Sequence, residues 1–306
     1  MVEISILIPT YNRKDYIKEC ILSAINQDYS NFEIIIVDNQ SNDGTWEICK
    51  ELSEIDTRIK LFRNENNIGP VLNWIRCARE ANGEYSKILF SDDTLDVICL
   101  SSLKKVITNN DIGFSFCAAR IGNNISESSI FYTSNLNSVY DMKAYIKKLL
   151  SGDAPVSPGA ILLRTKDLIK ALNIKIESTI IRPYNSHGAG PDLLISLQTL
   201  LDYKYVIGIN EPLVFFRSHK NSLTITDKNF EVSDGYASTW CYFTKKNISI
   251  FYWAYCVALF YIQFKDKKKG SYSIKKFSKM YNGKGTFIEI CLIYFFTNYI
   301  LFSSKC

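Results

Sequence analysis

The sequence predicts an α/β fold: a mostly parallel central sheet flanked by helices, followed by a helical C-terminal appendage. Over the first hundred residues, short apolar runs alternate strictly with amphipathic stretches. Such alternation of strands and helices is typical of a parallel sheet covered on both faces. Beyond about residue 235 the composition turns aromatic and basic, with few strand signals. At 306 residues, 47% of them hydrophobic, the chain is long enough for one large domain with an appendage.

The first hundred residues predict strands and helices in alternation. Apolar residues between Tyr16 and Ile25 recur at helical spacing, and Pro9 and Pro70 mark the end of the first strand and the first turn of the third helix. The predicted strands are 4–9, 32–37, 59–63 and 87–90, and the predicted helices are 16–25, 45–52 and 70–81. Binding residues are then expected just beyond the carboxyl ends of the strands.

From about 100 to 220 the pattern becomes a less regular mixture of helices and strands. The predicted helices are 99–109, 141–150, 165–172 and 192–201, and the predicted strands are 112–119, 159–163, 205–209 and 213–217. No fixed-period repeat or low-complexity tract occurs, which argues against solenoids and disordered tails.

The charge of +5 is concentrated near the C-terminus, where Lys265-Asp-Lys-Lys-Lys269 is followed by four more lysines up to Lys284. Such a stretch suits an anionic membrane surface or a nucleic acid. Its aromatic neighbours, such as Trp253 and Tyr261, favour the membrane, so no nucleic-acid partner is expected. The nine cysteines include no Cys-x-x-Cys pair, and no signal peptide is recognisable. We therefore expect a reduced, cytosolic chain whose cysteines pack as small hydrophobic residues.

Three polar clusters follow predicted strands: Pro9 to Arg13, Asp38, and Ser91-Asp92-Asp93. The adjacent carboxylates of Asp92 and Asp93 repel each other, and a hard cation with oxygen ligands removes that conflict. Alone, such a pair can equally be a helix N-cap beside a solvated neighbour.

The clusters belong to five ordered sequence blocks. These are Ser5-Ile-Leu-Ile-Pro-Thr-Tyr-Asn-Arg13, Glu33-Ile-Ile-Ile-Val-Asp38-Asn-Gln-Ser-Asn-Asp43-Gly-Thr45, Asn66-Asn-Ile-Gly-Pro70, Ala81-Asn-Gly-Glu-Tyr85 and Phe90-Ser-Asp-Asp-Thr-Leu95. In order and spacing they resemble the nucleotide-binding half of family 2 glycosyltransferases. A lone Asp-Asp pair would be weak evidence, whereas five blocks together are specific.

The resemblance implies a GT-A fold, a nucleotide-sugar donor (a UDP-sugar above all) and inversion at the anomeric carbon. It implies that Pro9, Thr10, Tyr11 and Arg13 line the nucleotide pocket and that Asp38 hydrogen-bonds the base. Asp92 would lie near the ribose and donor sugar, and Asp93 would bind the Mn²⁺ or Mg²⁺ that bridges the diphosphate. The chain departs from the family at Asn39 and Ser91, where many members carry aspartates. Both departures leave the preferred base open.

Beyond residue 150 two shorter segments resemble the family. Gly188-Ala-Gly-Pro-Asp192 matches the start of the helix that carries the catalytic base, so Asp192 is the candidate base. The alternative is a carboxylate that only stabilises a helix N-terminus. Glu177 and Asp167 are weaker rivals, and His187 is interpreted as a loop residue that faces the acceptor.

The second segment, Phe215-Phe-Arg-Ser-His219, matches the closing strand of the family's fold. Arg217 would neutralise the leaving phosphate, and the imidazole of His219 would ligate the metal. The alternative for His219 is an ordinary surface histidine.

The tail contains two apolar runs. Residues 248–264 carry no charge, and residues 287–302 are interrupted by Glu289 and Asn298. The first run would form a helix of about 26 Å, shorter than the ~30 Å hydrocarbon core. Three interpretations stay open: a subdomain packed on the catalytic core, an interfacial membrane anchor, or a membrane span.

Together these features predict residues 1–98 as the nucleotide-sugar-binding half, 99–234 as the acceptor-binding half and 235–306 as the helical tail. The predicted activity is metal-dependent, inverting transfer of one sugar to a saccharide, or to a lipid-linked saccharide. By resemblance to the family, such an enzyme suits bacterial O-antigen or capsule synthesis at the cytoplasmic face of the inner membrane.

Three other classes of protein share part of this pattern. A nicotinamide-dependent oxidoreductase needs a glycine fingerprint after the first strand, which is absent. A processive synthase would carry several spans and an Arg-Trp pair, also absent. A non-catalytic nucleotide-sugar or carbohydrate-binding protein remains the alternative.

Overall fold

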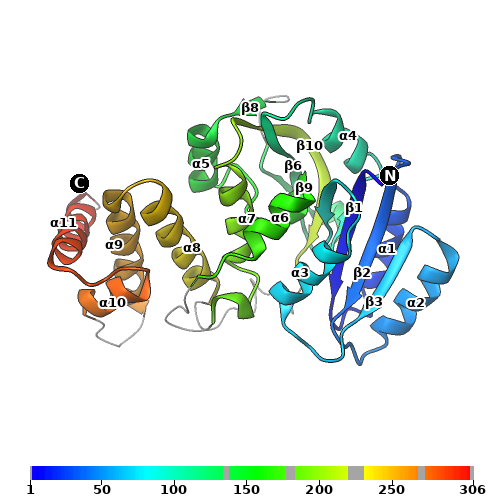
Figure 1. Cartoon of the computed structure of the whole chain (residues 1–306), viewed down its shortest axis with the longest axis horizontal. Coiled ribbons are helices and arrows are strands. Elements are labelled where there is room, and N and C mark those ends of the chain that lie inside the picture. Colours follow the sequence, from blue (N-terminus) through cyan, green and yellow to red (C-terminus); the bar gives the residue numbers. More distant parts are fainter. Residues whose placement is uncertain (1, 134–137, 177–182, 220–230, 268–272, 304–306) are drawn as a thin grey trace. The chain divides into compact units, whose positions relative to one another are not determined.

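The computed structural model describes residues 2–133, 138–176, 183–219, 231–267 and 273–303 (Figure 1). The chain forms two compact units. The first, the sheet unit, comprises Met1–Ile174 and Ile195–Thr226, and the second, the helical unit, comprises Lys175–Leu194 and Asp227–Cys306.

The sheet unit contains all the strands of the described residues. The strands are β1 (Ile4–Thr10), β2 (Phe32–Asp38), β3 (Ile59–Arg63), β4 (Tyr85–Ile88), β5 (Thr94–Leu95), β6 (Ile112–Gly122), β7 (Ser129–Phe131), β8 (Ser138–Tyr140), β9 (Ile161–Arg164) and β10 (Tyr205–Arg217). Its helices are α1 (Ile17–Ile25), α2 (Thr45–Ile55), α3 (Pro70–Glu80), α4 (Cys99–Lys105), α5 (Met142–Ser151) and α6 (Thr165–Leu172). The boundary between the units falls within α7 (Pro191–Thr199).

The strands form one sheet in the order β3-β2-β1-β4-β9-β6-β10-β5, with β7 beside β6 and β8 beside β10. The parallel arrangement predicted for the first four strands is confirmed. The sheet as a whole is mixed rather than mostly parallel, because β9 runs antiparallel to both β4 and β6, and β5 runs antiparallel to β10.

Side-chain alternation divides the core between the two faces of the sheet. Ile4, Ile6 and Ile8 of β1 belong to the same buried cluster as Cys20 of α1 and Cys49 of α2. Residues of β1 and β2 at the intervening positions point to the opposite face, where α3 packs against these two strands and beside α6. The predicted covering of both faces is therefore confirmed, and the carboxyl ends of β1, β2 and β4 meet at one edge.

Several predicted boundaries were wrong. Helix α4 ends at Lys105 rather than at residue 109. The two strands predicted at 205–209 and 213–217 form one strand, β10, with irregular register on both sides of Pro212. Proline offers no N–H to the ladder, so the sequence around it resembles a turn although the strand continues through a bulge. Strands β5, β7 and β8 were not predicted because each has three residues or fewer.

The helical unit contains α8 (Glu231–Asn247), α9 (Ile250–Lys267), α10 (Ile274–Met280) and α11 (Phe287–Ser303). Trp253 of α9 is fully buried in its core, and the indole N–H donates to the carbonyl of Tyr281 at 2.8 Å. The amino group of Lys245 lies 4.3 Å from the centre of the Trp253 ring and pairs with Glu289 at 2.7 Å. The helices predicted after residue 235 are thus present, in a unit that comprises Lys175–Leu194 and Asp227–Cys306.

The structure bears on two features of the sequence, its cysteines and the apolar runs of its tail. All eight cysteines in the described ranges are free thiols, and six of them are buried, as expected for packing residues. Across those same ranges, no helix has both the length and the apolar character required to cross a bilayer.

Candidate active site

The two neighbouring aspartates follow β4 in a tight turn. The N–H of Asp93 donates to the carbonyl of Phe90 at 2.9 Å, and Thr94 then begins the short strand β5. Because β5 pairs with the end of β10, Thr94 lies opposite Phe215. The pairing therefore brings residues near 217 to the aspartates, across more than a hundred residues of sequence.

Arg217 contacts both aspartates through its backbone and side chain. Its backbone N–H donates to Asp93 Oδ1 at 2.9 Å, and its Nε donates to the carbonyl of Asp92 at 3.1 Å. The Nη2 group pairs with Glu19 at 2.6 Å, and the guanidinium lies 5.4 Å from the centre of the Tyr16 ring. Arg217 is thus held at the carboxyl edge of the sheet as a fixed positive charge.

His219 and Arg13 converge on the other aspartate. The His219 Nε2 lies 3.0 Å from Asp92 Oδ2, and the Arg13 Nε lies 3.4 Å from the same oxygen. The imidazole ring stacks on Tyr16 with centroids 4.8 Å apart. The structure therefore joins five of the predicted site residues, Arg13, Asp92, Asp93, Arg217 and His219, in one cluster. His219 contacts Asp92, the neighbour of the proposed metal ligand Asp93.

Sequence reasoning missed three contributors to this cluster. Tyr16 and Glu19 occupy the start of α1 at helical spacing, but nothing local connects them to a strand two hundred residues later. Lys87 is fully buried in β4, where its amino group donates to the carbonyls of Gly159 and Ile88. The sequence signal that could have identified Lys87 is a lysine within an apolar run, because a buried positive charge needs a partner that compensates it.

The charges around Asp93 oppose one another. Burial of its carboxyl group, and then repulsion from Asp92, raise the pKa of Asp93 well above its usual range, against the attraction of Arg217 and Lys87. Only 7% of Asp93 is exposed. A group in this situation is stabilised as a carboxylate by any additional positive charge.

A divalent cation fits this edge only if oxygen atoms from outside the protein, such as those of a bound phosphate, supply most of its coordination. Within the described ranges, no group of three or more His, Cys, Asp or Glu residues could hold a metal ion by itself. Asp93 uses one oxygen to accept from the Arg217 N–H. One or two carboxylates, supplemented by phosphate oxygens and water, are a usual arrangement for Mg²⁺. Asp93 and its neighbour Asp92 suit such a shared site.

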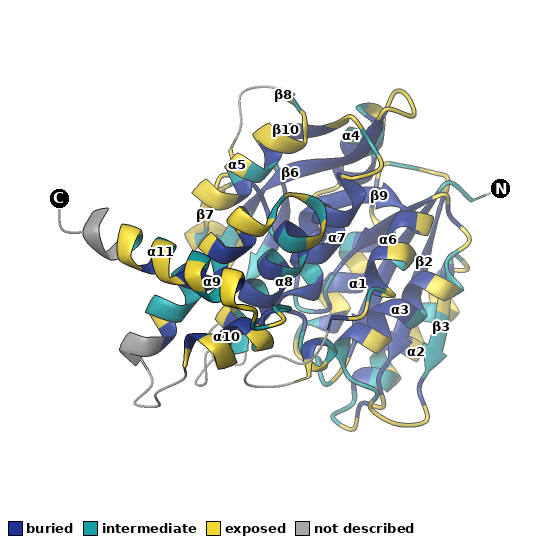
Figure 2. Ribbon diagram, turned by 60° about the vertical axis from the view of Figure 1, so that its left-hand side comes forward, coloured by how far each residue is buried: buried dark blue, intermediate teal, exposed yellow. Residues whose placement is uncertain are grey.

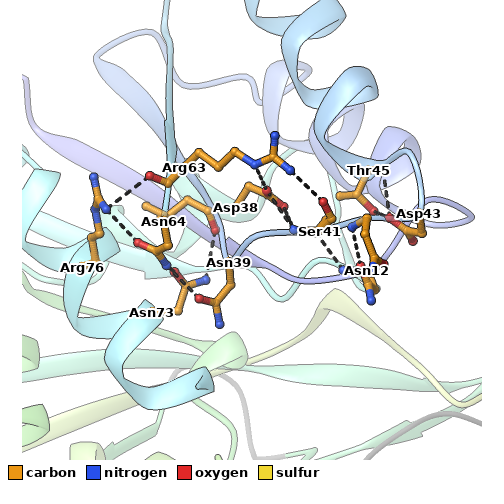
Figure 3. A network of polar contacts seen from close by, with 12 residues as sticks. Asn12, Asp38, Asn39, Ser41, Asp43, Thr45, Arg63, Asn64, Asn73 and Arg76 are labelled. Atoms are coloured by element: carbon orange, nitrogen blue, oxygen red, sulfur yellow. Dashed lines mark hydrogen bonds and ion pairs between the residues drawn. The ribbon is translucent and has the colours of Figure 1, made fainter. Parts of the chain in front are cut away.

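Asp38 lies at the end of β2 in a second polar cluster (Figure 3). It is in register with Thr10 of β1 and Arg63 of β3, so three strand ends meet there. The carboxylate is fully buried and accepts from the N–H of Ser41 at 3.1 Å, while Arg63 Nε lies 3.1 Å away. Arg63, whose guanidinium lies 4.9 Å from the centre of the Trp46 indole, was not predicted.

Asn39 belongs to a network of asparagines (Figure 3). Its Oδ1 accepts from Asn64 Nδ2 at 2.8 Å and from the N–H of Ile68 at 3.0 Å. Its Nδ2 donates to Asn67 at 2.8 Å and to the carbonyl of Gly69 at 3.4 Å. An aspartate carboxylate could also accept the first two hydrogen bonds, but it could not donate the last two. The departure from the family at this position therefore has a structural explanation, since Asn39 fastens the loop after β3.

The remaining predicted nucleotide residues lie at the end of β1. Pro9 and Thr10 are buried, and the Thr10 hydroxyl makes no hydrogen bond within the described ranges. Tyr11 is 40% exposed. Asn12 has a positive φ of 48°, and its N–H donates to the Ser41 hydroxyl at 2.9 Å. This turn links the β1 edge to the loop that follows Asp38.

Asp192 belongs to the helical unit. Its Oδ1 accepts from the N–H groups of Gly190 at 2.8 Å and Leu193 at 2.7 Å, and its Oδ2 accepts from the Tyr236 hydroxyl at 2.9 Å. Burial raises the pKa of Asp192 to about 7, against the lowering effect of these hydrogen bonds. Gly190 has a φ of 106°, and a Cβ there would lie 2.7 Å from the carbonyl oxygen of Gly235.

The rival carboxylates differ in their surroundings. Asp167 is buried in α6 and accepts from the Tyr203 hydroxyl at 2.7 Å. Glu177 lies outside the described residues. The His187 Nδ1 accepts from the N–H of Ala189 at 3.0 Å, so this ring helps to shape the loop before Asp192.

The family description "Glycosyl transferase family 2" matches residues 5–172, more than half of the chain. The chain belongs to this family. Its GT-A fold is also supported by solved structures. The TarS 1-349 protein of S. aureus in complex with UDP-GlcNAc has a TM-score of 0.59 at 17% identity over 92% of this chain and 70% of that one. The mannosyltransferase PcManGT of Pyrobaculum calidifontis, in complex with GDP-Man and Mn²⁺, has a TM-score of 0.50 at 14% identity over 99% of this chain and 75% of that one.

Among curated relatives, the GalNAc(5)-diNAcBac-PP-undecaprenol beta-1,3-glucosyltransferase of Campylobacter jejuni is 38% identical over 104 residues. That region covers 34% of this chain and 34% of the relative. Matches to the first relatives cover from 20% to 56% of their lengths.

Proposed function

We propose that the protein is an inverting glycosyltransferase that transfers one sugar from a nucleotide-diphosphate donor to a saccharide acceptor with the help of Mn²⁺ or Mg²⁺. The observation that carries this proposal is the convergence of Asp92, Asp93 and Arg217 at the carboxyl edge of a GT-A sheet. A binding protein would have no need to bury one carboxylate of a repelling pair, that of Asp93, beside a fixed arginine. The same cluster suits a diphosphate that leaves with developing negative charge.

In this proposal the residues of the edge hold the donor. Asp38 with Arg63, and the turn from Pro9 to Arg13, would form the nucleotide side of the pocket. Asp93 would bind the metal, with His219 as a further candidate ligand, and the ion would supply charge neutralisation to the diphosphate. Arg217 would stabilise the leaving phosphate, because its guanidinium is already oriented by Asp92 and Glu19.

Asp192 would accept the proton of the acceptor hydroxyl as that oxygen attacks the anomeric carbon from the face opposite the nucleotide. A carboxylate with a pKa of about 7 is suited to this role, since a general base works best when its pKa lies near the working pH. Tyr236 and the two backbone N–H groups would hold the carboxylate in one orientation.

We further propose a UDP-sugar donor and a lipid-linked saccharide acceptor, in bacterial surface-polysaccharide synthesis. UDP-GlcNAc in the TarS complex and the undecaprenol-linked substrate in the name of the Campylobacter relative support these choices. A lipid-linked acceptor places the reaction at a membrane, and we propose a peripheral position on its cytoplasmic face.

Two measurements test the proposal. A panel of nucleotide sugars with Mn²⁺ should raise the melting temperature with one donor above the others, and that donor should be hydrolysed slowly without acceptor. Asp93→Asn should lose hydrolysis, whereas Asp202→Asn, which removes an exposed carboxylate paired with Lys170, should not. Stabilisation by a donor without hydrolysis or transfer would instead favour the non-catalytic binding protein.

A further inference from the structure

The exposed face of α11 is apolar along its described length. The exposed positions between residues 287 and 300 recur at spacings of three and four. They are Phe287, Ile288, Cys291, Tyr294, Phe295, Asn298 and Tyr299, and Asn298 is the only one of these with an amide side chain. At 82% exposed, Phe287 has almost its whole side chain in solvent, and Phe295 is 62% exposed. Figure 2 shows exposed positions recurring along this helix. A surface helix of a water-soluble domain normally presents polar residues on this side.

The inner face of α11 is already occupied. Ile293 is fully buried in the core of the helical unit, and the buried Glu289 pairs with Lys245. We call the exposed apolar residues of α11 the aromatic stripe. Rotation of the helix to bury this stripe would expose Ile293 and break the partly buried ion pair between Glu289 and Lys245. The stripe is a second apolar face, separate from the one that holds the fold together.

Helix α9 extends the apolar surface sideways. Tyr255 of α9 contacts Phe296 of α11 edge to face, with centroids 5.6 Å apart. Phe251 and Tyr252, in the same turns of α9, are 58% and 61% exposed. Tyrosine is enriched at the boundary between hydrocarbon and water, and phenylalanine is common on the apolar face of interfacial helices.

In the described segment from residue 273 to residue 286, which leads into α11, the charged side chains are all positive. Lys275, Lys276, Lys279 and Lys284 are exposed, and Lys275 and Lys279 lie against Gly285, directly before α11. Between residues 273 and 300 the only acidic residue is Glu289, which is buried. Two copies of this face would repel each other through their lysines, whereas an anionic lipid surface would attract it.

We propose that α11, with the exposed aromatics of α9, is the surface by which the protein binds an anionic bilayer, lying in the plane of the interface. The aromatic stripe would enter the headgroup and upper acyl region, and the lysines around Gly285 would lie at lipid phosphates. The inference rests on the proposed function, since a lipid-linked acceptor would be met at this surface. It differs from the sequence prediction based on the lysines at 265–269. Lys268 and Lys269 are outside the described residues, and only the backbone of Lys265 and Lys267 is described.

Co-sedimentation of the full chain with vesicles tests the proposal. The vesicles would be phosphatidylcholine alone or with phosphatidylglycerol. The test variant is Ile288→Ser/Phe295→Ser, and the matched control is Ile55→Ser/Phe131→Ser, which removes an exposed isoleucine and phenylalanine from the sheet unit. We expect the parent and the control to sediment with anionic vesicles and the test variant to bind at least roughly tenfold more weakly. Lys275→Gln/Lys279→Gln/Lys284→Gln should weaken binding roughly fivefold per lysine at low salt and less at high salt.

Three outcomes would overturn the proposal. The parent could stay in the supernatant with anionic vesicles at low salt, or the test and control variants could bind equally well. Light scattering could also reveal a lipid-free dimer that the test variant abolishes, which would make the stripe a contact between copies. Donor-induced thermal stabilisation and hydrolysis, measured on the same samples, report the proposed function separately. Their loss with vesicle binding intact would contradict that function but not this surface.

Discussion

The pKa of Asp192 leads to a prediction that joins activity and stability. If this residue is the general base, it must be ionised to work, and turnover should therefore fall as the pH drops below about 7. Asp192→Asn should lower turnover by about 10²- to 10⁴-fold while donor binding stays close to that of the parent.

The same residue should oppose folding at neutral and alkaline pH. Its pKa is raised from 3.8 to about 7 by burial, so the folded chain holds this proton where the unfolded chain has released it. Its contribution to stability is complete below pH 4 and is lost as the pH rises to about 7. A difference of about three pH units corresponds to at most about 4 kcal/mol. Relative to the parent, Asp192→Asn should therefore gain up to about that much between pH 4 and pH 8.

Urea unfolding at several pH values, together with pH–rate profiles, measures both effects. Asp167→Asn is the control, because it too removes a carboxylate that accepts from a tyrosine hydroxyl. It should retain transfer activity. Tyr236→Phe removes a hydrogen bond to the ionised carboxylate and should move the acidic limb to higher pH by about one to two units. An acidic limb near pH 4, or an Asp192→Asn variant with more than a fifth of the parent turnover, would refute the assignment of the base.

Three further predictions concern the metal and the framework. Asp93→Asn should keep the fold but abolish transfer, and EDTA should reproduce this loss in the parent, with Mn²⁺ restoring only the parent; full activity in EDTA would contradict a metal. Asn39→Asp should reduce the unfolding free energy by about 1–3 kcal/mol in urea titrations, because a carboxylate cannot donate to the loop after β3; an unchanged midpoint would contradict that role. Gly190→Ala should lower the melting temperature, since its φ is positive and a Cβ would meet the carbonyl of Gly235; a thermal melt no lower than the parent's would show that the loop adjusts without cost.

The sequence predicted the elements that local patterns determine. Strands β1 to β3 and helices α1 to α3 have apolar spacing that fits one secondary structure, and their boundaries agree with the structure within a few residues. Strand β10 was divided in two because Pro212 resembles a turn in sequence and acts as a bulge in the sheet. Pairing with β6 decides between these interpretations, and pairing is not a local property.

The candidate site shows the same distinction between local sequence patterns and contacts made by distant segments. Asp92 and Asp93 were found because they follow an apolar run, and Arg217 and His219 because their segment resembles the closing strand of the family's fold. That the Arg217 N–H donates to Asp93 depends on the register of β5 against β10. Glu19 gave no signal, since an exposed glutamate on a helix is ordinary until its distant partner is known.

The position of β10 within the sheet has a consequence for synthesis of the chain. β10 lies between β6 and β5, and one edge of the long strand β6 pairs with it from Tyr205 to Arg217. Until the chain has been synthesised as far as residue 217, the N–H and C=O groups on that edge of β6 have no partner strand, and they lie next to Phe114 and Phe116. Open apolar edges of this kind recruit other strands and lead to aggregation. A fragment that ends at residue 172, where the family match ends, would keep this edge permanently open, so it should be recovered as aggregates rather than as an isolated donor-binding domain.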